Sequence, residues 1–149
     1  MNIDNWQKSE LAKLLSQIHS KSMLNFYSED VSTFWDELDD KTNLEGDVDK
    51  DFFLRMSIYI IEKISTEKDK IESLAKVLYD VHSSHLVGFY ISKGDFNKYR
   101  NDKASTLFMY NWENLEEDLS DDDVVDRKFF RKMSKIILDE LHLSTAKNN

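Results

Sequence analysis

The sequence contains no cysteine and no proline, and it has only three glycines among its 149 residues. Without cysteine, the protein has no disulfides, thiolate nucleophiles or cysteine metal ligands. Phosphate-binding loops need glycine where the backbone approaches the ligand, and neither the P-loop nor the dinucleotide-binding pattern occurs. A β-rich fold needs more glycine and proline in its turns than this, so the composition favours helices.

Long apolar runs are also absent from the sequence. No stretch approaches the ~20 residues that a membrane-spanning helix needs. The N-terminus lacks the basic start and apolar core of a signal peptide. We therefore expect a cytoplasmic protein that does not associate with membranes. Three Trp, six Tyr and nine Phe supply enough apolar bulk for one folded domain over 1–149.

Two parts of the chain resemble each other. At an offset of 63, the segment 11–27 matches 74–90 at eight of seventeen positions. At an offset of 77, the segment 48–64 matches 125–141 at seven of seventeen positions. The offset grows by 14, which places an insertion over 91–104 in the second copy. Two matches in the same order predict a tandem duplication.

The predicted fold class is all-α, a six-helix domain built from two tandem three-helix repeats, at about 8–66 and 71–143. Apolar residues at helical spacing predict the helices. In the first repeat they fall at about 5–25, 30–40 and 49–64, and the middle helix of the second repeat falls at about 107–119. Two pairs, Thr66 with Asp69 and Ser120 with Asp123, are predicted to open the fourth and last helices as capping boxes. Twofold packing and solenoid stacking of the repeats both fit this pattern.

Negative charge is concentrated at the same place in both repeats, from the end of the second helix to the start of the third. The segment 36–51 carries eight acids and two bases, and 113–126 carries eight acids and no base, so the remainder of the chain is positive although the net charge is −9. Carboxylates at the end of a helix are disfavoured by its dipole, and crowded like charges repel. Relief by a cationic partner would explain this arrangement, and an ordinary solvated polar face is the simpler alternative.

The candidate partner-binding residues are these acids and the tryptophan that precedes them in each repeat. They are Trp35, Asp36, Glu37, Asp39, Asp40, Trp112, Glu113, Glu116, Glu117, Asp118, Asp121, Asp122 and Asp123. Each tryptophan also falls on the apolar stripe of its predicted helix, as expected of a core residue, and a tryptophan beside charged groups suits an interface as well.

Other chemistry has less support. A calcium-binding EF-hand loop with Gly46 at its sixth position would place Lys41 at the first ligand position, so we expect no such site. His19 and His82 recur in the two repeats, either as a metal or acid–base pair or as groups that pin the first helix of each repeat. The insertion 91–104 contains interleaved basic and aromatic residues. It could be a loop that contacts a partner or an ordinary surface loop. We expect no cofactor, no resident metal and no catalytic residues.

In size, acidity, lack of cysteine and lack of a catalytic motif, the chain resembles the small cytoplasmic immunity proteins that bacteria pair with secreted toxins. This resemblance implies a non-enzymatic inhibitor that binds a basic toxin domain, such as a nuclease, in a tight complex and does not contact nucleic acid directly. One alternative is an inhibitor that mimics nucleic acid and occupies a DNA- or RNA-binding protein. Another is a small helical metal-binding enzyme or sensor that uses His19 and His82. The partner's identity, the repeat that binds it and the oligomeric state stay open.

Overall fold

The computed structural model describes residues 4–20, 35–41, 48–83, 112–118 and 125–143. These residues form four α-helices and one short 3₁₀ turn, and they contain no strand, so the all-α prediction is confirmed for this part of the chain. The elements are α1 (Asn5–His19), α3 (Lys50–Ser65), α4 (Lys70–Ser83), η2 (Trp112–Asn114) and α7 (Arg127–Glu140).

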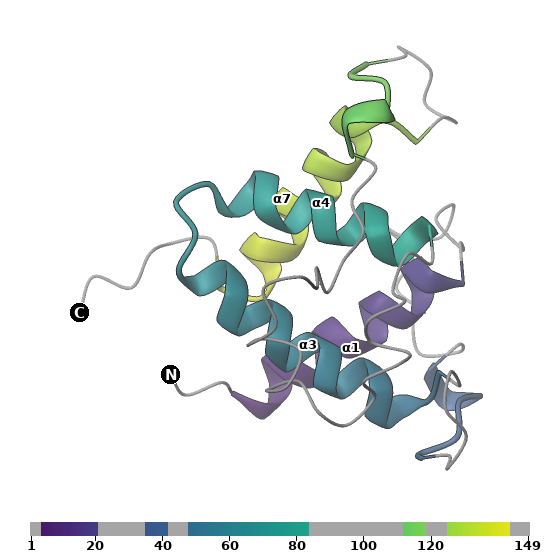
Figure 1. The fold of residues 1–149 in the computed structure, drawn as a ribbon. Coiled ribbons are helices and arrows are strands. Elements are labelled where there is room, and N and C mark those ends of the chain that lie inside the picture. The colour runs from purple at the N-terminus through teal and green to yellow at the C-terminus, as the bar shows by residue number, and fades with distance from the viewer. Residues whose placement is uncertain (1–3, 21–34, 42–47, 84–111, 119–124, 144–149) are drawn as a thin grey trace, which may run out of the picture.

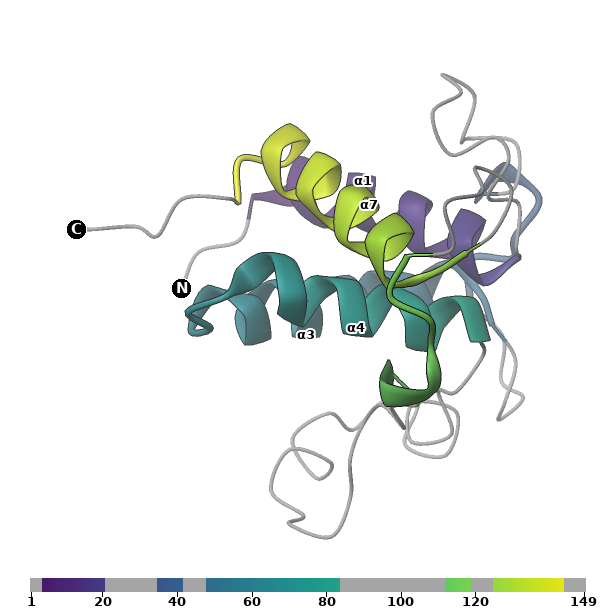
Figure 2. The same cartoon turned by 90° about the horizontal axis from the view of Figure 1, so that it is seen from above.

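The helices pack in two pairs. α1 lies against α3 and α4 lies against α7, and α4 also packs on α1 and α3 (Figure 1). Viewed from above, α1 and α7 form one layer and α3 and α4 form the other (Figure 2). Apolar side chains from all four helices meet in one core, including the fully buried Leu15, Phe52, Leu78 and Phe130. Removing a buried phenylalanine side chain of this kind costs about 3–5 kcal/mol.

The prediction of six helices is not supported, because turns replace most of the helix in the described parts of the two predicted middle helices, 35–40 and 112–118. Of 35–40, Trp35 and Asp36 are helical and the chain turns from Glu37 onward. Of 112–118, the residues 112–114 form the 3₁₀ turn η2. The reason is the same in both places. An amide bonds to the carbonyl three residues back, Leu38 to Trp35 and Leu115 to Trp112, both at 3.1 Å, and the carbonyls that follow are taken by the next helix.

Aspartates cap the helices at positions that differ from the predicted capping boxes. Asp49 accepts a hydrogen bond from the Phe52 amide at 2.7 Å, and Asp126 accepts one from the Phe129 amide at 2.7 Å. The last helix therefore begins after Asp126, not at Ser120 and Asp123, which lie outside the described residues. The other predicted box is also wrong, because Thr66 ends α3, while Asp69 caps α4 by accepting from the Glu72 amide at 3.0 Å.

Side chains at the start of two helices bond to the ends of two others. The Lys70 ammonium at the start of α4 donates to the Ile64 carbonyl at the end of α3, at 2.8 Å. The Gln7 amide in the first turn of α1 donates to the Leu141 carbonyl just past α7, at 2.7 Å. These bonds satisfy carbonyls that a helix end leaves without a partner, so they tie the helix termini together.

Candidate interaction surface

The first acidic segment, residues 35–41, runs beside the N-terminal end of α3. The amides of Lys50 and Asp51, at the start of α3, donate to the carbonyls of Asp39 and Asp40 at 2.9 and 3.0 Å. The half-buried Trp35 packs against the core, and the Lys50 ammonium lies 5.9 Å from its ring centre. The four predicted acids of this segment are exposed; they are Asp36, Glu37, Asp39 and Asp40.

The second acidic segment, residues 112–118, lies in the same way beside the N-terminal end of α7. The amides of Arg127 and Lys128 donate to the carbonyls of Glu116 and Glu117 at 2.8 and 3.1 Å. Trp112 is buried, and its ring faces the guanidinium groups of Arg127 and Arg131 at 5.7 and 5.6 Å. The four predicted acids of this segment are exposed; they are Glu113, Glu116, Glu117 and Asp118. The remaining predicted acids, Asp121, Asp122 and Asp123, lie outside the described residues.

This placement changes the helix-dipole argument for four of the acids. Asp39, Asp40, Glu116 and Glu117 lie beyond the described helical residues, which stop at Asp36 and Asn114, so these four do not end a helix. Their backbone instead joins the first turns of α3 and α7, where the helix dipole is positive and a carboxylate gains about 0.3–1 kcal/mol. The helix dipole therefore does not disfavour these acids, and the cost from mutual repulsion of clustered carboxylates stays a prediction.

Basic side chains neutralise part of the second acidic segment from within the protein. Arg127 pairs with Glu117 at 3.2 Å, Lys128 pairs with Asp118 at 3.4 Å, and Arg131 also bonds to Glu117. These bonds hold the pKa of the Glu117 carboxyl below its ordinary value, with the hydrogen bond from Arg131 as the largest cause.

Arg131 also joins this segment to α4. Its guanidinium bonds to both carboxylate oxygens of Glu72, Nε to Oε1 at 2.7 Å and Nη2 to Oε2 at 3.2 Å, and the Trp112 indole donates to Oε2 at 3.0 Å. The hydrogen bond from Arg131 is the main reason that the pKa of Glu72 is lowered. Neither residue stands out in the sequence, since a pair separated by 59 positions leaves no local signal.

Among the described residues, the first acidic segment has no counterpart of the Arg131–Glu72 bonds. Leu54 and Ser9 stand at the positions that the offsets of 77 and 63 match with Arg131 and Glu72, and neither side chain carries a charge. The Lys50 ammonium lies 3.5 Å from a carboxylate oxygen of Asp40, whose side chain is 95% exposed. Within the described ranges, the three other acids of this segment form no ion pair; they are Asp36, Glu37 and Asp39.

The two repeated histidines take part in aromatic packing. The rings of His19 and Phe53 meet edge-on with their centres 5.7 Å apart, and His82 and Phe130 do the same at 5.7 Å. Among the residues that the structure describes, no three His, Asp or Glu side chains are placed to hold a metal ion. The insertion 91–104 lies outside those residues.

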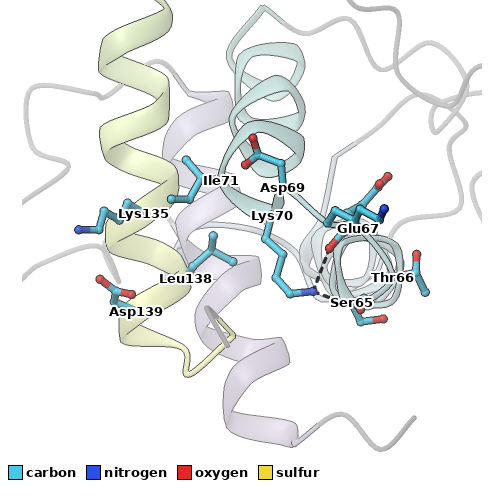
Figure 3. Close-up of a pocket in the computed structure, with 10 residues that line it drawn as sticks. Ser65, Thr66, Glu67, Asp69, Lys70, Ile71, Lys135, Leu138 and Asp139 are labelled. Carbon is cyan, nitrogen blue, oxygen red and sulfur yellow. Dashed lines mark hydrogen bonds between the residues drawn. The ribbon is translucent and has the colours of Figure 1, made fainter. Parts of the chain in front are cut away.

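A pocket of about 530 Å³ is lined by the connection between α3 and α4 and by residues of α7 (Figure 3), and no acid of the two acidic segments lines it. Its charged border is mixed, with Glu67, Lys70, Lys135 and Asp139 among the lining residues. The Lys70 ammonium is turned toward the carbonyls at the end of α3 and is already bonded to them. The pocket therefore presents no concentrated charge of one sign.

Comparisons with protein-family models, with curated proteins and with solved structures find no match for this chain. Within the described ranges, no helix has both the length and the apolar character needed to cross a membrane.

Proposed function

We propose that this protein acts by binding, without catalysis, and that it neutralises a basic protein partner through its first acidic segment. The supporting observation is the difference between the two segments. In the second segment Glu117 and Asp118 face cations of the protein itself, and Glu113 and Glu116 form no ion pair among the described residues. In the first segment Asp40 lies near Lys50, and the other three acids, Asp36, Glu37 and Asp39, face no cation in the described part of the chain. Unpaired, exposed carboxylates raise the rate at which the protein encounters a basic surface. A basic surface that normally binds phosphates can bind carboxylates in their place.

We further propose that the chain is a tandem duplication. Contacts in one half recur in the other at matching positions, as in the Asp49 and Asp126 caps and the His–Phe pairs. The bonds between an acidic segment and its helix recur as well, at an offset of 77. Recurrence of backbone bonds and side-chain contacts together favours a common origin over chance similarity of helical sequences.

The packing of the proposed halves fits a twofold relation. Gln7 and Lys70 occupy matching positions at the offset of 63, and their acceptors, Leu141 and Ile64, match at the offset of 77. In each half, the side chain at this position therefore caps the end of a helix in the other half. Lys70 of the second half caps α3 of the first, and Gln7 of the first half caps α7 of the second. Such reciprocal contacts are typical of an isologous interface, whereas a solenoid would repeat the contact in one direction only.

The class of partner that we propose is a toxin domain with a basic cleft, such as a nuclease, in a bacterial cytoplasm. This follows from the resemblance to immunity proteins and from the negative charge that the protein leaves uncompensated. A nucleic-acid mimic is the second candidate, and it requires both acidic segments to contact the partner. The ion pairs that occupy the second segment favour the inhibitor over the mimic.

The test uses two variants that remove the same charge from matching positions. D36N/D39N neutralises two acids of the first segment, and E113Q/E116Q neutralises their counterparts at an offset of 77. All four side chains are exposed, so both variants should fold as the wild type does. The partner is isolated from the native host with the wild-type protein, identified, and then titrated with each variant at several salt concentrations.

We expect a basic partner, binding that weakens as salt rises, and a loss of affinity of tenfold or more in D36N/D39N alone. Equal losses in both variants would support mimicry in place of the proposed surface. Binding that responds to neither salt nor either variant would refute a role for the acidic segments.

A further inference from the structure

Asp80 is a buried carboxyl group in the middle of α4. The residue is 0% exposed, and neither of its carboxyl oxygens has a hydrogen-bond partner among the residues that the structure describes. An ionised carboxylate without a partner is strongly disfavoured in such surroundings, whereas the neutral acid is tolerated. Burial accordingly raises the pKa of Asp80 to about 8.

On α4, Ile71 and His82 contact α7, and at about 100° per residue Asp80 is roughly opposite to both around the helix. Tyr79 and Glu72 also contact α7, and they lie about 100° and about 80° from Asp80 around the helix. The other helices packed on α4 are α1 and α3.

Within the described part of the chain, no charged group is a cause of the raised pKa of Asp80, which burial produces. On the neighbouring helices, Glu10 pairs with Lys13 on α1, Asp51 with Arg55 on α3, and Arg131 of α7 with Glu72. Lys76 lies one helical turn before Asp80 on α4, and it does not contribute to the raised pKa either.

The matching position in the first half supports this description. Gln17 is the counterpart of Asp80 at the offset of 63, near the end of α1, and its side chain is 1% exposed. An amide is polar and uncharged at every pH, and the protonated form of aspartic acid is its nearest counterpart among the acids. Both halves thus bury an uncharged polar side chain at the same place, but only the one in α4 can acquire a charge.

We propose that Asp80 makes the bundle pH-responsive: the protein folds around the neutral acid, and loss of its proton destabilises the folded state. In the unfolded chain the group ionises near its ordinary pKa of 3.8, and in the folded protein it keeps its proton to about pH 8. The folded state therefore binds one more proton than the unfolded state between these limits. The contribution of Asp80 to the stability of the folded state is greatest in acid, falls as the pH rises, and is constant above about pH 8.

The experiment compares the unfolding of the wild type with that of D80N, which keeps the shape and cannot ionise. Urea unfolding at a series of pH values between 4.5 and 8.5 gives the ratio of the two unfolding equilibrium constants. One extra bound proton changes this ratio by about tenfold per pH unit, so we expect D80N to gain about a hundredfold relative to the wild type between pH 5 and pH 7. D139N, at an exposed position of α7, is the matched control and should show no such trend.

A second variant and a second measurement keep the test decisive. Q17E places an ionisable acid at the matching position and should acquire the same loss of stability with rising pH. If D80N does not fold, the Asp80 carboxyl can be titrated by NMR in the wild-type protein. A ratio that does not change with pH, or a carboxyl that titrates near pH 4 in the folded protein, would overturn the proposal.

Discussion

The pair formed by Arg131 and Glu72 should be a measurable source of stability, since it joins α7 to α4 through two charge-assisted hydrogen bonds. The side chains are 32% and 29% exposed, which reduces solvent screening relative to a surface pair. We expect R131M to lose about 2 kcal/mol, about 1–1.5 from the bidentate pair and about 0.5–1 from the contact with the Trp112 ring. For a domain of this size the loss lowers Tm by roughly 4–8 °C.

A double-mutant cycle isolates the contribution of the pair itself. R131M, E72Q and the double variant are unfolded in urea and followed by circular dichroism, and the coupling free energy should be about 1 kcal/mol. K132M, an exposed neighbour on α7, serves as the control and should change stability by less than about 0.5 kcal/mol. Additive losses in R131M and E72Q, to within about 0.3 kcal/mol, would show that the two side chains do not stabilise each other.

The same pair predicts a pH dependence opposite in sign to that of Asp80. Because Arg131 lowers the pKa of Glu72 in the folded protein, the carboxylate stabilises the fold above its ordinary pKa of 4.5, and this contribution is lost as the pH falls through the lowered value. The stability difference between wild type and R131M should therefore shrink in acid. A difference that is as large at pH 2.5 as at pH 7 would contradict the assigned ion pair.

Two further predictions test the proposed duplication. Replacement of either capping aspartate, D49A or D126A, should cost about 1–2 kcal/mol in urea unfolding, while D49N should recover most of the loss at its site because the amide oxygen can still accept the helix amide. A circular permutant that is opened within 66–69 and joins residue 149 to residue 1 should fold with a loss of no more than about 1 kcal/mol, because the Gln7–Leu141 bond already holds α1 against the end of α7. An unfolded permutant would count against the twofold arrangement.

Local sequence pattern was sufficient for much of the helical structure. The third predicted helix, 49–64, differs by one residue at each end from α3, Lys50–Ser65, because an apolar stripe follows a capping aspartate there. The predicted start of α7 was wrong because several serines and aspartates precede it, and any of them could serve as a cap. A choice among neighbouring caps depends on which carboxylate meets the helix amides, and spacing alone does not determine that.

For the candidate surface, too, some features could be predicted from the sequence and others depended on the geometry of the fold. The positions of the acids and of both tryptophans could be read directly, and the burial of Trp112 agrees with the apolar stripe on which it falls. The sign of the dipole acting on those acids could not be read, because it depends on where the middle helices stop. The prediction that Asp39, Asp40, Glu116 and Glu117 end a helix was wrong for that reason.

Amino-acid order alone therefore determined that the chain is helical, that its two parts match, and that negative charge collects at the same place in each. Helical periodicity, sequence identity and charge are properties of neighbouring residues, so they survive without any knowledge of packing. Tertiary structure alone decided which charges are compensated and which are buried. Arg131 meets Glu72 although 59 positions separate them in the chain, and Asp80 loses contact with water only when other parts of the chain cover α4. The free energies of an ion pair and of a buried carboxyl group depend on distances in space and on the exclusion of solvent. Neither quantity can be read from the order of residues in the chain.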